Sequence, residues 1–207
     1  MPIAREGWVF ILGPLALAGT LWGAGWHAGG AGALAVALML AFFFRDPRRE
    51  VPEGEGLILA PADGTVVAVA RYPGNELQEE ATQLSIFLSV LDVHVNRAPV
   101  ATVVERVDYK RGTFRLAWRD EASRANEQNL ILLKTAGGRL LVKQIAGFLA
   151  RRIVCRVAPG QHLETGERIG MILFGSRVDL IVPASARLSV KPGDRVKGGS
   201  SVVGVLA

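Results

Sequence analysis

Cysteine is almost absent from this chain: Cys155 is the only one in 207 residues, so no intramolecular disulfide can form. No Cys or His stands near it at the spacing of metal ligands. Aromatic residues make up only 7% of the chain, and most lie in or beside the apolar N-terminus. These absences exclude a disulfide scaffold, predict no metal site, and argue against stacking platforms for single-stranded nucleic acid. A reducing compartment fits them.

Charge is missing from the N-terminal part of the chain. Asp, Glu, Lys and Arg are absent between residues 8 and 44. Residues 8–26 begin and end with Trp, and these nineteen uncharged residues match a hydrocarbon core of about 30 Å. A Gly-rich turn leads into 31–44, which is short, so that a tilted, re-entrant or interfacial helix is an alternative to a span. The pattern predicts a hydrophobic helical hairpin that anchors residues 1–49 to a membrane.

Positive charges beside this hairpin set its expected orientation. The chain has a net charge of +5; Arg5 precedes the first apolar stretch, and Arg45, Arg48 and Arg49 follow the second. A hairpin brings all four to one side, which the positive-inside rule makes cytoplasmic. Basic residues beside an apolar anchor also favour anionic lipid. We therefore expect the inner membrane of a prokaryote. A cleaved signal peptide fits less well, because a second apolar stretch follows at once.

Residues 50–207 have the sequence of a mainly β domain. Short runs rich in Val, Ile and Leu are bounded by Gly, Pro, Asp or Asn. Residues 159–166 (PGQHLETG) resemble residues 192–199 (PGDRVKGG), thirty-three positions later. Both have the hairpin signature of barrel-sandwich domains of the lipoyl or biotinyl type. Unless so short a match is chance, two copies predict two similar layers packed face to face.

Three polar residues interrupt the apolar runs. Asp63 lies at a Pro-Ala-Asp-Gly turn, His94 ends a buried-looking strand, and Ser176 follows Gly175 within an apolar strand. Each alone has a structural interpretation, as a turn former, a core histidine or a bend. Together, an Asp, a His and a Ser permit a charge-relay arrangement with the His as base. However, Ser176 lacks the Gly-x-Ser-x-Gly spacing of a nucleophile elbow, which argues against an ordinary serine hydrolase.

Taken in order, several fragments resemble a known family. Phe-Gly-Ser at 174–176, Pro-Ala-Asp-Gly at 61–64 and Asp-Val-His at 92–94 are similar to motifs of phosphatidylserine decarboxylases of the short, prokaryotic type. Arg-Asp-Pro at 45–47 and Asn-Glu-Gln-Asn at 126–129 fit the same family. Each fragment is a weak signal alone, but their order and spacing are specific, and the resemblance runs from the hairpin to the C-terminus.

The resemblance implies a proenzyme that cleaves itself between Gly175 and Ser176. The Ser176 hydroxyl would attack the Gly175 carbonyl, with His94 as the base and Asp63 orienting it. The products would be a large chain, 1–175, and a small chain, 176–207, which begins with a covalent pyruvoyl group made from Ser176.

The resemblance also implies the reaction: phosphatidylserine in an anionic membrane would lose CO2 and become phosphatidylethanolamine. Loss of CO2 leaves an electron pair that no ordinary side chain can delocalise, so a Schiff base between the pyruvoyl carbonyl and the substrate amine would accept it. Self-cleavage, decarboxylation or both are open as the task of His94. In the longer branch of the family a second His stands where this chain has Arg97. Arg97 is instead a candidate for binding substrate phosphate or carboxylate, with a solvated Arg as the alternative.

Three other functions stay open from the sequence alone. A membrane-anchored lipoyl-like adaptor explains the hairpin and the repeat, but no Lys stands in the setting that lipoylation needs. A Ser-His-Asp lipid hydrolase predicts one intact chain with Ser176 unmodified. A pyruvoyl decarboxylase for a soluble amino acid leaves the hairpin without a purpose. Besides the substrate, the expected partner is the chain's own small fragment; a homo-oligomer is open, and nucleic acid is not expected.

Overall fold

The computed structural model describes residues 2–114, 122–147, 152–173 and 176–206. The chain forms two compact units, Met1–Arg48 and Arg49–Ala207. The sequence placed Arg49 with the hairpin, whereas the structure places it in the second unit, where its side chain binds Asp63 at 2.8 Å. The first unit is helical and the second is mainly β.

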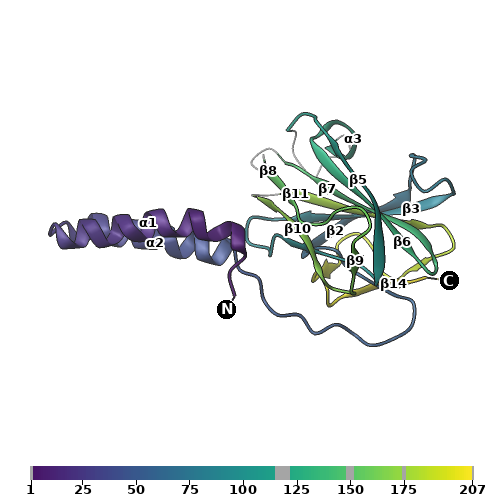
Figure 1. Cartoon of the computed structure of the whole chain (residues 1–207), viewed down its shortest axis with the longest axis horizontal. Helices are drawn as coiled ribbons and strands as arrows, with labels where there is room; N and C mark the ends of the chain where they lie inside the picture. The colour runs from purple at the N-terminus through teal and green to yellow at the C-terminus, as the bar shows by residue number, and fades with distance from the viewer. Residues whose placement is uncertain (1, 115–121, 148–151, 174–175, 207) are drawn as a thin grey trace. The chain divides into compact units, whose positions relative to one another are not determined.

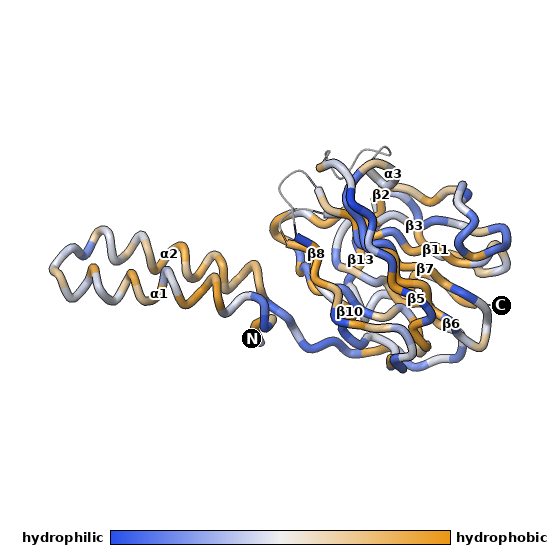
Figure 2. The backbone as a smooth tube through the Cα atoms, turned by 45° about the horizontal axis from the view of Figure 1, so that its top comes forward, coloured by the Kyte–Doolittle hydropathy of each residue, from blue (hydrophilic) through white to orange (hydrophobic). Residues whose placement is uncertain are grey.

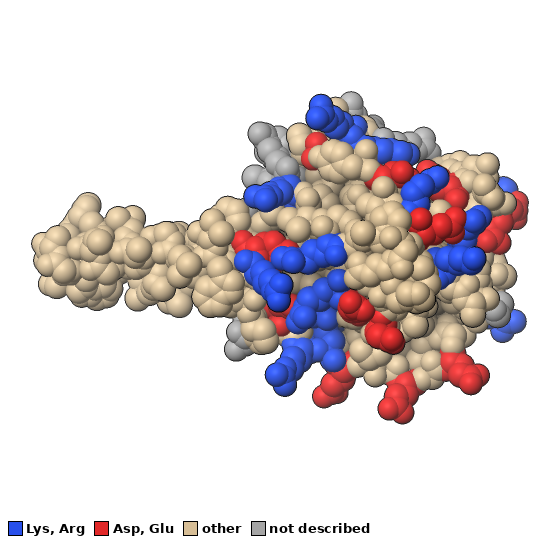
Figure 3. Space-filling model, viewed as in Figure 1, with Lys and Arg blue, Asp and Glu red and all other residues tan. Residues whose placement is uncertain are grey.

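The first unit is a helical hairpin. A 3-10 turn, η1 (Arg5–Gly7), precedes α1 (Trp8–Gly23) and α2 (His27–Phe43), and the two helices run side by side (Figure 1). Its ends meet where the Ala4 amide donates to the Phe44 carbonyl at 2.8 Å, so Arg5 and Arg45 lie at one end, as expected. Apolar residues cover most of both helices (Figure 2), and no charged side chain is seen along them (Figure 3). Within the described residues, no helix has both the length and the apolar character needed to cross a bilayer.

The second unit is built from three antiparallel sheets, which confirms the mainly β prediction. The long, curled sheet has the strand order β13-β2-β3-β11-β7-β6-β5-β9, and the two short sheets have the orders β1-β14-β12 and β4-β10-β8. The strands are β1 (Leu57–Leu59), β2 (Gly64–Arg71), β3 (Ala81–Leu88), β4 (Val95–Arg97), β5 (Thr102–Lys110), β6 (Gln128–Thr135), β7 (Gly138–Ile145), β8 (Arg152–Cys155), β9 (His162–Leu163), β10 (Arg168–Leu173), β11 (Ser176–Pro183), β12 (Arg187–Leu188), β13 (Arg195–Val196) and β14 (Val202–Val205); one helical turn, α3 (Ala122–Ala125), precedes β6.

These sheets repeat one another about an approximate two-fold axis. Counted inward from its two edges, the long sheet has corresponding strands: β13 corresponds to β9, β2 to β5 and β3 to β6, and the two central strands, β11 and β7, correspond to each other. β2 has a register irregularity after Val66, and β5 has one after Val104, 38 positions later (66 to 104). β1 and β4 are also 38 positions apart (57 to 95), and each pairs with the middle strand of a short sheet. The repeat found in the sequence supplies the two edge strands, β9 and β13, thirty-three positions apart (162 to 195). The repeat thus extends over the whole β unit.

One half of this unit is inserted into the other. The strands β4 to β10 form a continuous half, whereas β1 to β3 and β11 to β14 form its partner half. In the continuous half, β6 and β7 are joined by a tight hairpin at Ala136 and Gly137. At the equivalent place in the other half, the chain leaves β3 through residues 89–94 and re-enters this half at Ser176, the first residue of β11. The insertion therefore creates two chain crossings between the halves, an outgoing one from β3 to β4 and a returning one from β10 to β11.

The core lies on one face of the long sheet. Along β11, Val178, Leu180 and Val182 belong to the main core and are 0% exposed. Ile181 faces the other way, into a smaller cluster with Leu141 and others. Because side chains alternate along a strand, Ser176 shares the core face with Val178. Each fully buried aliphatic side chain contributes about 1.5–3 kcal/mol, so this face holds the halves together.

Candidate active site

Ser176 opens β11 at the returning crossing. Its backbone pairs with Leu88, the last residue of β3, and its side chain is 0% exposed. Gly175, on the other side of the predicted cleavage bond, lies outside the described residues. The Oγ atom has no hydrogen-bond partner among the described residues. Buried hydroxyl groups are nearly always paired, so an unpaired one at this place is a candidate nucleophile.

His94 ends the outgoing crossing, directly before β4. Its side chain is 0% exposed, and the Nδ1 atom lies 2.9 Å from the carbonyl oxygen of Asp92. A carbonyl oxygen only accepts hydrogen bonds, so Nδ1 carries the proton and donates it. In the neutral ring, Nε2 then has the lone pair that a general base needs. Strand β10 contacts the outgoing crossing at this residue, since the Ile172 amide donates to the His94 carbonyl at 3.4 Å.

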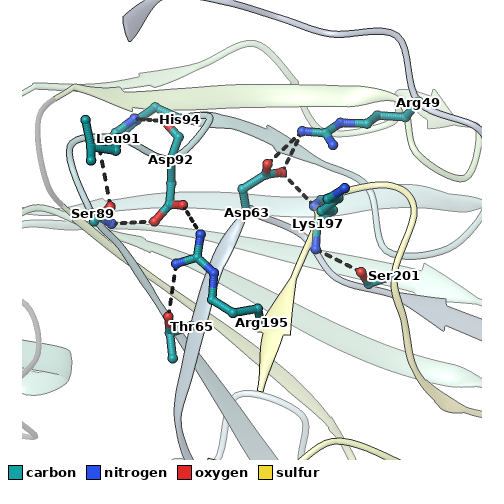
Figure 4. A network of polar contacts seen from close by, with 11 residues as sticks. Arg49, Asp63, Thr65, Ser89, Leu91, Asp92, His94, Arg195, Lys197 and Ser201 are labelled. Atoms are coloured by element: carbon teal, nitrogen blue, oxygen red, sulfur yellow. Dashed lines mark hydrogen bonds and ion pairs between the residues drawn. The ribbon is translucent and has the colours of Figure 1, made fainter. Parts of the chain in front are cut away.

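The outgoing crossing is fixed by Asp92, whose side-chain role the sequence did not reveal. Its Oδ2 accepts from the Ser89 amide at 2.8 Å, which closes a tight turn. Its Oδ1 accepts from Arg195 at 2.6 Å, and Arg195 also donates to Thr65 at 3.2 Å (Figure 4). Asp92 thereby ties the segment that carries His94 to strands β13 and β2.

Asp63 lies in the same region, between β1 and β2 (Figure 4). Its carboxylate accepts from Arg49 at 2.7 and 2.8 Å and from the Gly198 amide at 2.8 Å. The Nδ1 atom of His94 is held by the carbonyl of Asp92, and an orienting role of Asp63 stays a prediction. Asp63 fixes the turn that begins β2 and the loop that follows β13.

Arg97 is buried at the end of β4, not solvated. Its side chain is 7% exposed, and Nη1 donates to the Gly166 carbonyl at 3.0 Å. Glycine at position 199 makes room for it, since a Cβ there would lie 2.7 Å from Arg97 Cδ. A guanidinium keeps its positive charge when buried, so Arg97 places a cation three residues after His94 in the chain.

The approximate two-fold relation allows these residues to be compared with the equivalent positions at the other end of the sheet. Position 56 is equivalent to 94, and the Leu206 amide donates to Gly56 at 2.8 Å just as that of Ile172 donates to His94. Positions 101 and 137 are likewise equivalent to 63 and 175. Gly56, Ala101 and Gly137 line one cavity of about 520 Å³. The counterparts of Gly56 and Ala101 at the other end of the sheet are His94 and Asp63, two of the predicted catalytic residues.

A buried ion pair lies on the opposite face of β11 and was missed in the sequence. Arg177 donates to Asp179 at 2.6 Å and to Ser85 at 2.6 Å. Asp179 also accepts from Ser123 at 2.6 Å and Gln83 at 3.0 Å. Arg177 and Asp179 are 2% and 0% exposed. The spacing of two in an apolar strand was the available signal, because it places both on one face.

Burial, hydrogen bonds and charges around this cluster shift three pKa values. Burial lowers the pKa of Lys143, although the carboxylates of Asp179 and Glu76 oppose the effect. Burial and a 2.7 Å hydrogen bond to Glu76 raise the pKa of Tyr72. Burial pushes the pKa of Glu76 up, but the bond from Tyr72, a backbone amide and nearby lysines outweigh it, so this pKa lies below its ordinary value. The cluster is thus a charged network built into the fold.

No group of three or more His, Cys, Asp or Glu side chains in the described part of the chain is arranged to hold a metal ion. Cys155 is half-buried, and its Sγ lies 3.5 Å from the Val157 carbonyl oxygen.

Comparisons with known proteins agree with the motifs. The family model described as phosphatidylserine decarboxylase matches residues 36–204. A protein of Solibacter usitatus named phosphatidylserine decarboxylase proenzyme is 48% identical over 168 residues, which cover 81% of this chain and 79% of that protein. Proteins with the same name from Symbiobacterium thermophilum and Geobacter sulfurreducens are 45% and 42% identical, each over 99% of this chain and over 95% and 97% of their own lengths.

Proposed function

Because the chain belongs to the phosphatidylserine decarboxylase family and is therefore a decarboxylase, we propose that it is made as a proenzyme, cuts itself between Gly175 and Ser176, and converts phosphatidylserine to phosphatidylethanolamine at a membrane. The observation that carries this proposal is the buried Ser176 hydroxyl with no partner among the described residues. A cut in the returning crossing, between β10 and β11, leaves every strand of both halves of the β unit in place. The small chain stays bound, because β11 pairs with β3 on one side and β7 on the other.

Self-cleavage begins when Ser176 Oγ attacks the carbonyl carbon of Gly175. Its proton passes to His94, whose Nδ1–H is held by the Asp92 carbonyl so that Nε2 is the basic atom. The carbon–nitrogen bond then breaks and the nitrogen takes up a proton, which leaves an ester. Loss of the Cα proton of residue 176 and of the Gly175 carboxylate gives dehydroalanine. Water converts this into a pyruvoyl group and releases ammonia.

The residues around position 176 fit a pyruvoyl group. When formed, this group supplies a ketone that accepts the electron pair left behind by CO2. The new chain end would be held by its pairing with Leu88 and by Arg177, which is bound to Ser85 and Asp179. Arg97 would supply positive charge for the phosphate or carboxylate of the headgroup.

A simple measurement tests the cleavage. Purified protein on a denaturing gel is expected to give two chains, and intact mass is expected to show a small chain lighter by one ammonia than a chain starting with Ser176. A Ser176→Ala variant stays whole. An active wild-type chain with Ser176 unmodified and still joined to Gly175 would overturn the proposal and favour a lipid hydrolase.

The hairpin supports the membrane part of the proposal. Large apolar side chains on α1 and α2 are exposed, among them Leu12 at 53% and Leu38 at 62%. A substrate with two acyl chains stays in the bilayer, so the enzyme must reach the surface. We expect Leu12→Glu with Leu38→Glu to reduce flotation with phosphatidylserine vesicles, while Val90→Glu, at an exposed apolar position of the second unit, leaves flotation unchanged. Equal flotation of all variants would contradict a role of the hairpin.

A further inference from the structure

We propose, on the basis of the self-cleavage proposed above, that Asn96 is a further catalytic residue: its Nδ2–H stabilises the oxyanion that forms when Ser176 attacks the preceding carbonyl. Asn96 lies on β4, two residues after His94, and is 0% exposed. Its Nδ2 atom has no hydrogen-bond partner among the described residues. A buried amide donor without an acceptor is costly unless an acceptor arrives during the reaction.

A chain of amides orients this donor. Asn129 Nδ2 donates to Gln144 Oε1 at 3.0 Å, and Gln144 Nε2 donates to Asn96 Oδ1 at 2.8 Å. Both bonds run in the same direction, so the last free group in the series is the NH₂ of Asn96. Gly170 makes room for the series, since a Cβ there would lie 2.9 Å from Gln144 Nε2. A donor fixed before the reaction needs no reorganisation when charge develops.

The register places this series beside Ser176. Gln144 on β7 pairs directly with Val178 on β11. Ser176, two residues earlier on the same face, is therefore a diagonal neighbour of Gln144, at about 7–8 Å between backbones. Asn96, on β4, contacts this face through its 2.8 Å hydrogen bond with Gln144. The uncut chain thus holds two unpaired buried groups in one region, a hydroxyl and an amide donor.

The other end of the two-fold repeat lacks these groups. The positions equivalent to Asn96 and Gln144, each 38 residues away, are Ile58 and Val182 (58 to 96, 144 to 182), and both are 0% exposed core residues. The same backbone positions are thus filled by hydrocarbon where no bond is to be cut. Apolar side chains satisfy the packing at these positions. Packing therefore does not account for the buried amides near Ser176, whereas a role in the reaction does.

The step itself balances simply. As Ser176 Oγ adds to the carbonyl carbon, the carbonyl π electrons move to its oxygen, and the hydroxyl proton goes to His94. The negative oxygen would accept the Asn96 Nδ2–H bond until the carbon–nitrogen bond breaks and the carbonyl re-forms. Removal of one such donor typically slows a reaction by about 10²–10³-fold.

The test follows cleavage of newly synthesised, labelled chain on denaturing gels. Asn96→Ala removes the donor, and Asn96→Asp keeps the size and the acceptor for Gln144 but has no N–H. Gln128→Met is the matched control, since Gln128 is a buried amide one residue from Asn129 that faces the opposite side of the sheet. We expect both Asn96 variants to cleave about 10²–10³-fold more slowly, and the control within a few-fold of wild type.

Folding and chemistry are separated in two ways. The thermal midpoint of each variant is measured in the uncut Ser176→Ala background, and if Asn96→Ala fails to fold, Asn96→Asp decides alone. Hydroxylamine cleaves an accumulated ester at Gly175, giving the hydroxamate and a free Ser176 hydroxyl. It should not restore the rate, because the donor acts before the ester forms.

Two outcomes would overturn the role of Asn96: a folded Asn96 variant that cleaves at the wild-type rate, or one whose cleavage hydroxylamine restores. An uncut wild-type chain would instead overturn the proposed self-cleavage, so the two failures are distinguishable.

Discussion

The two ends of the pseudo-symmetric β unit share a backbone and differ in what they carry. The equipped end carries Asp63, His94 and Ser176. At the other end, the blank end, the equivalent positions hold Ala101, Gly56 and Gly138. The matching hydrogen bonds of Ile172 and Leu206 show that the frame is the same. The fold therefore provides the geometry twice, while the side chains proposed for catalysis occur only once.

Connectivity is the second difference between these ends. At the blank end, β6 and β7 are joined by a hairpin in which Gly138 has φ of +114°, a conformation that L side chains rarely adopt. At the equipped end the hairpin is replaced by two crossings, and the later one carries the bond that we propose is cut. A cut at this place removes no strand from either half.

Replacing the proposed nucleophile should have the largest effect. Ser176→Ala should abolish both cleavage and decarboxylation, because neither the attacking oxygen nor the ketone can form. The control at the blank end is Thr135→Val, whose hydroxyl donates to Gly138 at 2.9 Å and accepts from Gly137 at 3.1 Å. That variant should lose about 1 kcal/mol of unfolding free energy and cleave normally. Gel analysis of fresh protein decides, and any two-chain product from Ser176→Ala would contradict the assignment.

Changing the proposed base should come next. His94→Gln keeps a side-chain N–H for the Asp92 carbonyl but has no basic nitrogen, so cleavage should slow by about 10²–10⁴-fold. His162→Gln, on the exposed edge strand β9, should cleave like wild type. First-order cleavage rates of the two variants are compared by gel, with decarboxylation of the matured fraction measured separately. A loss of decarboxylation alone would assign His94 to the later reaction.

The two ends also differ in the setting of equivalent arginines. Arg177 is 2% exposed and bound to Asp179, whereas Arg139, 38 positions earlier (139 to 177), binds Glu105 with its side chain 37% exposed. Removing one partner of a buried pair leaves a buried charge, so Arg177→Met should cost about 3–5 kcal/mol. Arg139→Met should cost about 1 kcal/mol or less. Urea denaturation in the uncut background gives both values, and equal losses would refute the distinction.

Sequence patterns predicted the local features of the molecule. Short apolar runs gave the β class, the uncharged stretch gave the hairpin, and interruptions of apolar runs marked Asp63, His94 and Ser176. The full extent of the repeat was missed because its two copies share few residues. Ala-Pro recurs at 60–61 and 98–99, but the position equivalent to Asp63 is Ala101. The Asn129–Gln144–Asn96 series was also missed. Its members belong to three strands, and only the register brings them together.

Asp63 sharpens the comparison because the structure gives it partners other than His94. Asp63→Asn weakens the bonds to Arg49 and Gly198, whose loss should cost about 1.5–3 kcal/mol. The reverse change at the blank end, Ala101→Asp, should leave residues 137–138 uncut. If Asp63→Asn slows cleavage more than its stability loss explains, Asp63 takes part in the chemistry. A folded variant that cleaves at the wild-type rate would limit Asp63 to holding the turn.

The smallest expected difference concerns Lys143, whose equivalent position is Ile181 (143 to 181). Burial lowers the pKa of Lys143 in the folded chain, against the pull of Asp179 and Glu76. Between this lowered pKa and the value of about 10.4 in the unfolded chain, unfolding takes up a proton, so stability should rise with pH through this window. Lys143→Ile makes the two ends alike and should remove that rise. Urea midpoints measured from pH 7 to 10 test it, and an unchanged slope would show that Lys143 titrates alike in both states.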